Sequence, residues 1–402
     1  MNERARAKRA PATAASGGTW QQHYSGSLIN AFGMPSRELV RGEGVYLYDD
    51  QGTRYLDLLA GIATASLGHA HPAYVAALAD QAATLSHVSN LFTSPNQIAL
   101  AERLSALLGH DAKVFLANSG TEANEAAFKV TRRTGRTRII AAENSFHGRT
   151  MGALAITHKA AYREPFEPLP GDVTFVPFGD VEALTAAVDD TVAAVVLEPM
   201  QGEAGVIVPA DGYLAAAREI TSRHGALLWL DEVQTGIGRS GAWFDHQREG
   251  IVPDLVTVAK GLGNGFPIGA CLATGATADL IQPGMHGSTF GGNPLASRAA
   301  LTVLGILEPL LPQINAVGDQ LAADLTGLPG VVAVHGRGLL RGVQLEKPVG
   351  AAMVAAGLEA GFILNAARPD RIRLAPPLII TSDDLVPFVA AWPALYSGAL
   401  AA

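Results

Sequence analysis

The segment from Ala112 to about Thr274 constrains the fold most, because strand, loop and helix patterns alternate along it. Several of its strand patterns, such as AAVVLEP and ALLWLDE, are continuous apolar runs. Such runs are typical of strands that helices cover on both faces of a sheet. The segment therefore predicts an α/β domain with a mostly parallel sheet, in which ligands bind outside the carboxyl ends of the strands. Four polar residues fall at those ends: Asn118, Glu198, Asp231 and Lys260.

The flanking segments indicate a smaller α+β domain. Two alternating apolar runs surround Asp49–Gly52, which is a hairpin signal, and helices are expected over 72–85 and 95–108. An Ala/Leu-rich segment over 293–325 is followed by strands, turns and a last helix. We expect a disordered tail over 1–18, an N-terminal segment of the small domain over 19–75, the large domain over 76–300, and the C-terminal small domain over 301–402.

Composition excludes several classes of protein. A formal net charge of -8 without a long basic run argues against nucleic acid as a partner. The single cysteine, Cys271, excludes an intrachain disulfide and lies in an apolar run, so we expect it to be buried. The N-terminal tail has no apolar region typical of a secretory signal, and no apolar run is expected to reach transmembrane length. These features predict a cytoplasmic protein without a membrane partner.

Lys260 ends the apolar run DLVTVAK and is followed at once by the turn sequence GLGNG. At the mouth of a buried strand, poor solvation lowers the pKa of a lysine, so that its neutral amine can attack a carbonyl and form a Schiff base. The alternative is a solvated lysine at a strand end, which is the usual case for a single lysine.

Two stretches could bind an anion such as phosphate. The first, NSGTE from Asn118, follows a strand and starts a helix, so that free N–H groups, hydroxyls and the helix dipole converge. Ser119 and Glu122 also have the spacing of a plain capping box. The second stretch, STFGGN from Ser288, brings a hydroxyl pair next to glycines, although an ordinary turn has the same composition.

Other candidates are an aromatic residue, two arginines and several acids. Phe146 could lie against a planar ring, and Arg149 could hold a carboxylate in a two-pronged grip. Asp231 ends a very apolar strand and therefore needs a cationic partner, either a protonated pyridine nitrogen or an arginine such as Arg239. Arg373, in an apolar strand, needs an acidic partner or ligand.

Glu198 and Glu203 flank a turn after another strand, where they could gate a pocket or cap a helix. A metal site is not expected, because no spacing of His, Cys, Asp and Glu matches one.

Taken together, these motifs resemble the class III pyridoxal-phosphate aminotransferases of fold type I. The resemblance covers nearly the whole chain after the tail. It is carried by LGHAHP, LSHVSNLF, NSGTEANEAAFK, FHGRTMGALAIT, LEPMQGEAGV, LDEVQTGIGRSG, AKGLGNGFPIGA, HGSTFGGNP, GRGLLRG and NAARPDRIRLAPPLII. It implies a large domain with a mostly parallel sheet flanked by helices, and a small α+β domain from the N- and C-terminal segments.

The resemblance also implies roles around pyridoxal 5'-phosphate. Lys260 would hold the cofactor and then move the proton during catalysis, while Asp231 would keep the pyridine nitrogen protonated. Phe146 would stack on the ring, with Val233 and Gln234 also in contact with the cofactor. The phosphate would be bound by Ser119, Gly120 and Thr121, helped by Thr289 of the neighbouring subunit. Each active site would then need two chains, which implies a homodimer.

For the substrates, the resemblance implies transfer from N2-acetylornithine to 2-oxoglutarate in arginine biosynthesis. Arg149, with Ser288 beside it, would hold the α-carboxylate of the donor. Arg373 would bind the α-carboxylate of glutamate and would pair with Glu203 when the ω-amino substrate is bound. The alternatives are a related aminotransferase acting on succinylornithine, ornithine, 4-aminobutyrate or succinyldiaminopimelate, or a non-catalytic module that binds a phosphate ligand.

The sequence departs from the family pattern at a few positions. Asn264 stands where the family usually has glycine, and Thr93 where tyrosine is frequent. Compared with ornithine aminotransferases, His147 replaces a common tryptophan and Ile62 replaces an aromatic residue. The last two departures favour the acetylated substrate over free ornithine.

Overall fold

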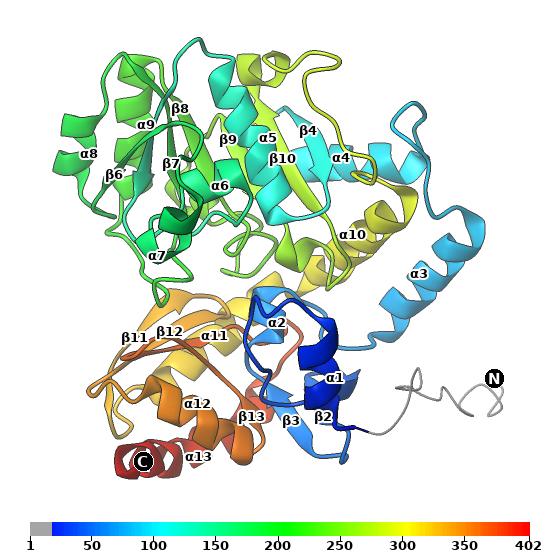
Figure 1. The fold of residues 1–402 in the computed structure, drawn as a ribbon, viewed down its shortest axis with the longest axis vertical. Coiled ribbons are helices and arrows are strands. Elements are labelled where there is room, and N and C mark those ends of the chain that lie inside the picture. Colours follow the sequence, from blue (N-terminus) through cyan, green and yellow to red (C-terminus); the bar gives the residue numbers. More distant parts are fainter. Residues whose placement is uncertain (1–17) are drawn as a thin grey trace.

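The computed structural model describes residues 18–402, which form two lobes (Figure 1). The upper lobe in the figure holds the central part of the chain, and the lower lobe combines segments from both ends. The predicted tail over 1–18 lies outside the described residues except for Gly18. The domain boundaries given above stay a prediction.

A seven-stranded sheet forms the centre of the upper lobe. All neighbouring strands pair in parallel except that β10 is antiparallel to the strands on its two sides. The prediction of a mostly parallel sheet is therefore confirmed. In spatial order, the strands are β4 (Ala112–Ala117), β10 (Gly269–Thr274), β9 (Leu255–Val258), β8 (Leu227–Asp231), β7 (Val192–Leu197), β5 (Arg138–Ala142) and β6 (Asp172–Val176).

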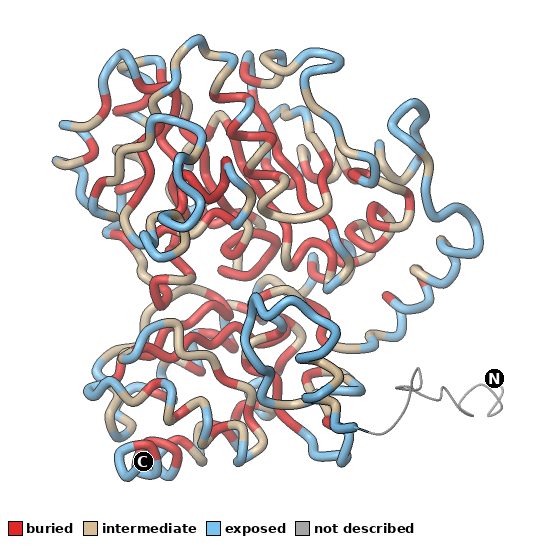
Figure 2. The backbone as a smooth tube through the Cα atoms, viewed as in Figure 1, coloured by how far each residue is buried: buried red, intermediate tan, exposed pale blue. Residues whose placement is uncertain are grey.

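Helices cover both faces of this sheet, as its continuous apolar strands predicted. Val195 of β7 belongs to a buried cluster with residues of α8 (Val181–Ala187) and α9 (Tyr213–His224). Its neighbour Val196 belongs to a second cluster with residues of α5 (Gly120–Arg132). Because successive side chains of a strand point to opposite faces, the two clusters lie on opposite sides of the sheet. Figure 2 shows the strands as the buried centre of the lobe.

The lower lobe contains two four-stranded sheets. The β2–β3 pair is antiparallel around Asp49–Gly52, so the predicted hairpin is confirmed. Strand β13, from the C-terminal part of the chain, pairs with β3, so both ends of the chain share one sheet. The first sheet is β1 (Leu39–Glu43), β2 (Tyr46–Asp49), β3 (Arg54–Asp57) and β13 (Phe362–Ile363); the second is β11 (Val331–Arg337), β12 (Leu340–Leu345), β15 (Arg371–Leu374) and β14 (Asn365–Arg368).

The predicted helices over 72–85 and 95–108 are confirmed to within one residue, as α3 (Pro72–Thr84) and α4 (Pro95–Leu108). Each begins with a proline at a position where its missing N–H costs nothing, and α4 is capped by the Ser94 side chain. The remaining α-helices are α1 (Trp20–Ser27), α2 (Ala60–Ala63), α6 (Met151–Ala155), α7 (Ala160–Arg163), α10 (Pro294–Leu307), α11 (Leu311–Leu325), α12 (Gly350–Glu359) and α13 (Ser382–Ala401).

The expectation that no apolar run reaches transmembrane length is wrong for one stretch. Pro294–Leu325, with 32 residues, is long and apolar enough to cross a membrane by length and composition alone. A short 3-10 turn, Glu308–Leu310, divides it into α10 and α11. Both helices contribute buried residues, among them Val303 and Leu321, to the largest hydrophobic core. In this fold the stretch therefore forms two core helices.

Candidate active site

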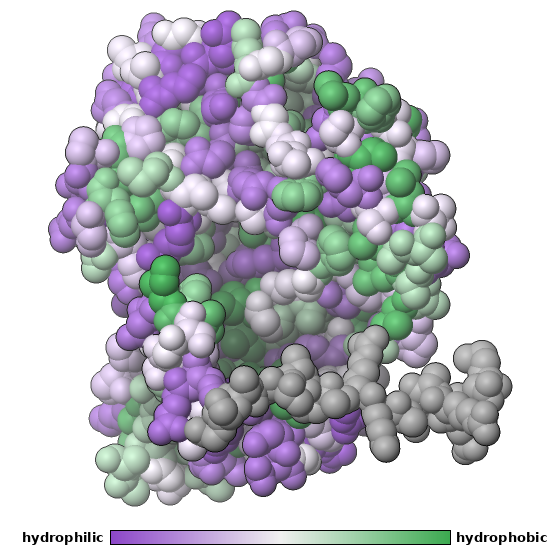
Figure 3. Space-filling model, turned by 45° about the vertical axis from the view of Figure 1, so that its right-hand side comes forward, coloured by the Kyte–Doolittle hydropathy of each residue, from purple (hydrophilic) through white to green (hydrophobic). Residues whose placement is uncertain are grey.

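A cavity of about 400 Å³ lies at the carboxyl ends of β4, β5, β7, β8 and β9. Thr64, from the N-terminal part of the chain, also lines it, and the molecular surface is hollowed between the lobes (Figure 3). Glu203 and Arg373 adjoin the cavity through Gln234. The predicted site residues that line it directly are Ser119, Gly120, Thr121, Phe146, Arg149, Asp231, Val233, Gln234 and Lys260.

The start of helix α5 forms an anion-binding end of the cavity. The N–H groups of Gly120 and Thr121 have no hydrogen-bond acceptor within residues 18–402. Ser119 Oγ caps the helix by accepting from the Glu122 N–H at 3.2 Å. The Glu122 carboxylate instead accepts from the backbone N–H of Asn118 at 3.0 Å, so only the Ser119 half of the alternative capping box forms. Free N–H groups, two hydroxyls and the positive end of the helix dipole thus remain for a phosphate.

A glycine is required where this helix begins. A Cβ added to Gly120 would lie 2.8 Å and 3.0 Å from the two γ-carbons of Val233. Real side chains do not approach that closely, so only glycine lets the start of α5 reach the loop after β8. This contact brings the anion-binding end near Asp231, the last residue of β8.

Asp231 is 4% exposed, and both of its carboxylate oxygens have partners. Oδ2 accepts from Asn124 Nδ2 at 2.8 Å and from His147 Nδ1 at 2.7 Å, and Oδ1 accepts from the Val233 N–H at 3.0 Å. The alternative pairing with Arg239 is wrong. That guanidinium donates instead to the carbonyls of Leu339 and Pro376, in the lower lobe.

Lys260 follows β9 and has a positive φ of 33°, which is uncommon for a residue with a side chain. Its amine is partly buried against the cavity. Burial lowers the pKa of Lys260 below its usual value; Arg373 lowers it further, while the nearby Glu203 opposes the shift. A larger fraction of the amine is therefore neutral at a given pH than for a solvated lysine.

Arg373 lies beside the cavity, fully buried, with a set of fixed partners. Its Nη1 is 2.5 Å from Glu203 Oε1 and donates to Gln234 Oε1 at 3.1 Å. Asn365 Oδ1 accepts from Nε at 3.1 Å and from Nη2 at 2.9 Å. Burial alone would raise the pKa of Glu203, but Arg373 and Lys260 together hold it below its usual value. Glu203 is thus an ionised partner for a buried arginine.

Glu198 connects two loops that border the cavity. Its Oε1 accepts from the Phe146 N–H at 3.1 Å, and its Oε2 accepts from the Gly202 N–H at 3.3 Å. Burial raises the pKa of Glu198 to about 7, with His147 opposing the shift and Asp231 adding to it.

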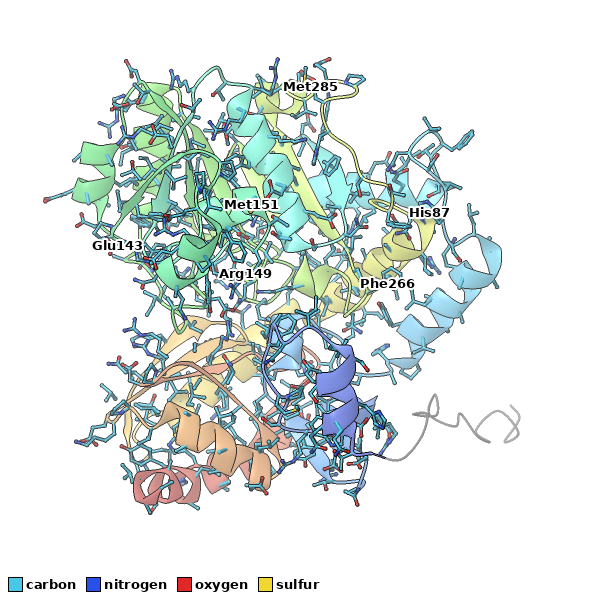
Figure 4. All side chains as sticks on the ribbon, viewed as in Figure 1. His87, Glu143, Arg149, Met151, Phe266 and Met285 are labelled. Atoms are coloured by element: carbon cyan, nitrogen blue, oxygen red, sulfur yellow. The ribbon has the colours of Figure 1, made fainter. Side chains whose placement is uncertain are left out.

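Arg149 lies at the edge of the upper lobe that faces the lower lobe (Figure 4). Its guanidinium carbon is 3.3 Å from the centre of the Tyr162 ring and 5.7 Å from the centre of the Phe146 ring. Within residues 18–402 it forms no ion pair and no hydrogen bond. This end of the cavity therefore offers an unpaired cation.

Ser288 and Thr289 do not line the cavity of their own chain. Ser288 Oγ accepts from Asn118 Nδ2 at 3.2 Å, and Asn118 lines the cavity whereas Ser288 does not. Thr289 is exposed. A second hollow, of about 630 Å³, lies next to this loop and includes Thr93 and Ser288 in its lining.

Asn264 and Ile62, two positions at which the sequence departs from the family pattern, lie in different surroundings. Asn264 has a φ of 49°, and its side chain accepts from the Leu67 N–H at 2.7 Å and donates to the Gly68 carbonyl at 3.3 Å, so it anchors the loop after α2. Ile62 is 39% exposed with a φ of 64° and does not line the cavity. Within residues 18–402, no group of His, Cys, Asp and Glu is placed to hold a metal ion.

Three polar residues that contact the site were not predicted from the sequence. Asn124 was visible only as a polar residue on the otherwise apolar face of α5, where it is 1% exposed. Asn365 is eight positions from Arg373, on the neighbouring strand β14, and Tyr162 is on α7, shortly after the loop that holds Arg149. No local pattern marks such partners.

The cavity has a complementary group for each part of a phosphorylated pyridine aldehyde. The start of α5 suits the phosphate, Phe146 and Val233 suit the ring, the buried carboxylate of Asp231 suits a protonated ring nitrogen, and Lys260 suits the aldehyde. This combination defines a pyridoxal-phosphate enzyme of fold type I.

The family follows from comparison with known proteins. Residues 31–391 match the family model described as aminotransferase class-III, and the chain belongs to this family, whose cofactor is pyridoxal 5'-phosphate. It is 56% identical to the acetylornithine aminotransferase of Mycolicibacterium smegmatis over 94% of this chain and 98% of that protein. The ornithine aminotransferase of Toxoplasma gondii is 31% identical, with a TM-score of 0.87 over 94% of this chain and 93% of that one. The N-acetylornithine aminotransferase of Stenotrophomonas maltophilia is 36% identical, with a TM-score of 0.79 over 91% and 97% of the two chains. The predicted class of enzyme, fold type and cofactor are thereby confirmed.

Proposed function

We propose that this aminotransferase moves the terminal amino group of N2-acetyl-L-ornithine to 2-oxoglutarate, giving N-acetyl-L-glutamate 5-semialdehyde and L-glutamate. One observation carries the proposal: two arginines near Lys260 are in opposite states. Arg373 is buried and paired with Glu203, whereas Arg149 is exposed and, in the described part of the chain, unpaired. The name of the relative from Mycolicibacterium smegmatis supports the same substrate.

The state of the two arginines suits an ω-amino donor. Such a donor has no carboxylate next to its reacting amine, so the arginine near Lys260 needs an internal counterion, and Glu203 supplies it. The distant α-carboxylate of acetylornithine binds the forked guanidinium of Arg149. In the return half-reaction, glutamate places its α-carboxylate at Arg373 and its distal carboxylate at Arg149. One cavity thus accepts two unlike amines in turn.

The remaining residues hold the cofactor and move protons. When bound, pyridoxal 5'-phosphate supplies an aldehyde and a ring that accepts electrons. Lys260 holds the aldehyde end and later moves a proton at the reacting carbon of the substrate. Asp231, oriented by Asn124 and His147, keeps the ring nitrogen protonated.

Several further groups position the cofactor. The phosphate binds Ser119, Gly120 and Thr121 at the start of α5. Phe146 and Val233 would contact the ring, and Gln234 would contact its 3-oxygen.

The proposal includes a homodimer whose subunits complete each other's sites. Thr289 is exposed and outside its own cavity, which leaves its hydroxyl available to the phosphate of a second subunit. Large apolar side chains near it are also exposed: Leu91 at 88%, Phe92 at 71% and Phe290 at 59%. Association of two copies would cover these side chains. We place the enzyme in the cytoplasm and in arginine biosynthesis.

The test is glutamate formation from 2-oxoglutarate by the purified protein with four separate donors: N2-acetylornithine, N2-succinylornithine, ornithine and 4-aminobutyrate. We expect a strong preference for acetylornithine. Preference for ornithine or 4-aminobutyrate would overturn the substrate while leaving the family intact. A protein whose absorption does not change with borohydride and that makes no glutamate from any donor would be a binding module instead.

A further inference from the structure

Tyr162 of α7 connects the unpaired Arg149 to the wall of the cofactor cavity. Its ring is half-buried and lies edge-on to the ring of Phe146, with the centres 6.5 Å apart and the planes at 85°. The Arg149 guanidinium carbon is 3.3 Å from the centre of the Tyr162 ring, and Lys159 Nζ is 4.5 Å from the same centre. The Lys159 ammonium also donates to the Tyr162 hydroxyl at 3.4 Å. One aromatic ring therefore contacts two cations at the mouth of the cavity.

The contact with Tyr162 leaves the hydrogen-bonding edge of Arg149 free. A guanidinium that stacks on an aromatic ring uses its face, and its N–H groups point outward in the plane of the group. A carboxylate binds to that edge with two parallel hydrogen bonds. Contacts with the two aromatic rings restrain the Arg149 guanidinium. Within residues 18–402 it forms no ion pair with an acid and no hydrogen bond with a carbonyl.

Without the ring, Arg149 would have many conformations at an exposed position, and a ligand would have to select one of them. Immobilising a flexible side chain weakens binding, whereas a side chain already held in place avoids that loss. Lys159 adds a second positive charge near the same position, which favours an anionic ligand.

We propose that Tyr162 is a positioning residue for carboxylate recognition: it stacks under Arg149 and presents the guanidinium edge to the donor's α-carboxylate. The inference rests on the proposed function, in which Arg149 binds that carboxylate. Tyr162 acts through Arg149, so its effect appears in substrate binding, and the transfer step itself is unchanged.

The test compares Tyr162→Leu, which removes the ring, with Tyr162→Phe, which keeps the ring and removes only the hydroxyl. Tyr162→Leu removes the cation–π contact, and the ligand must then immobilise the Arg149 side chain. The two effects together should raise KM for acetylornithine about 3-fold to 10-fold. Its kcat should stay within about 2-fold, and Tyr162→Phe should restore KM nearly to the wild-type value. A fall in kcat with unchanged KM, or an equal rise in KM for Tyr162→Phe, would overturn the proposal.

A matched control is available at Phe175 of β6, whose ring contacts Arg163 at 4.8 Å outside the cavity. Phe175→Leu removes the same kind of contact and should leave KM unchanged. If it raises KM as much as Tyr162→Leu does, the effect is general loosening of the lobe and the proposal fails.

Binding without turnover gives an independent measurement. N-acetyl-L-norvaline has the α-carboxylate and acetyl group of the donor but no transferable amine. In the matched compound N-acetyl-L-norvalinamide, an uncharged carboxamide replaces the α-carboxylate. Calorimetry on the holoenzyme should show that N-acetyl-L-norvaline binds Tyr162→Leu about 3-fold to 10-fold more weakly than it binds wild type. The affinity for N-acetyl-L-norvalinamide should be the same for both proteins.

An Arg149→Leu variant distinguishes the proposed role of Arg149 in binding the carboxylate from the proposed role of Tyr162 in positioning Arg149. If Arg149→Leu does not weaken binding of the acid, the assignment of the carboxylate to Arg149 in the proposed function fails. If Arg149→Leu weakens it and Tyr162→Leu does not, only the role of Tyr162 fails.

Discussion

Replacing Glu198 with glutamine should change the stability of the protein in a pH-dependent way. The Glu198 carboxyl is 5% exposed, and its pKa is raised from 4.5 to about 7, mainly because burial penalises the charged form. A glutamine has nearly the same shape but does not titrate. The way in which the difference between the two proteins changes with pH therefore isolates the cost of ionising this one buried group.

The size of the effect follows from the shift in pKa. A change from 4.5 to about 7 corresponds to roughly 3 kcal/mol. Since the folded pKa is the higher one, the folded protein binds more protons than the unfolded chain between these pH values. The stability that Glu198 contributes is thus complete below pH 4.5 and is lost as the pH rises through about 7.

The glutamine also loses one acceptor. Glu198 accepts from two backbone N–H groups, those of Phe146 and Gly202, and the amide can accept from only one of them. The unpaired N–H should cost about 1–3 kcal/mol at every pH. Glu198→Gln should therefore be less stable than wild type at pH 5 and about as stable, or more so, at pH 8.

Denaturant unfolding of the holoenzyme at fixed protein and cofactor concentrations measures this difference at several pH values. Glu219→Gln serves as the control, because Glu219 is exposed on α9 and its difference from wild type should stay constant. A difference between Glu198→Gln and wild type that does not change between pH 5 and pH 8 would show that folding does not raise the pKa of Glu198.

Three further substitutions test the site. Lys260→Ala should abolish transamination while circular dichroism stays unchanged; substantial residual turnover would place the essential amine elsewhere. Glu203→Ala should raise the activity toward α-amino donors relative to ω-amino donors, because the counterion of Arg373 is removed, and an unchanged ratio would refute that role. Gly120→Ala should weaken retention of pyridoxal 5'-phosphate in dialysis, since its Cβ would meet Val233 and overpacking costs about 1–3 kcal/mol. Gly305→Ala, with open space around its Cβ, should retain the cofactor as wild type does.

The fold could be predicted from local patterns because each pattern follows from a short stretch of chain. The continuous apolar strand AAVVLEP matches β7, whose six residues are all buried, and the turn at Asp49–Gly52 matches the hairpin. Asp231 and Lys260 could be selected for a related reason: a charged residue directly after a buried strand is costly unless it has a partner.

The partners themselves could not be predicted, because they come from distant segments. The protein partner that the sequence offered for Asp231, as the alternative to a pyridine nitrogen, was Arg239, eight positions along the chain. The chain turns between them, and Arg239 donates to carbonyls of the lower lobe. His147 and Asn124 take its place, from the loop after β5 and from α5. The order of strands in the sheet decides these neighbours, and the sequence carries no local signal for it.

The geometry of the Glu203–Arg373 pair indicates which partner moves in the proposed reaction. The Arg373 side chain is 2% exposed and is held on its other side by Asn365, whereas the Glu203 side chain is 34% exposed. The glutamate can therefore turn toward solvent while the arginine keeps its position. An incoming α-carboxylate would then replace one carboxylate by another at the same guanidinium. Because Glu203 raises and Arg373 lowers the pKa of Lys260, this exchange would leave the balance of charge around Lys260 nearly unchanged. The same lysine could then serve both half-reactions with a similar pKa.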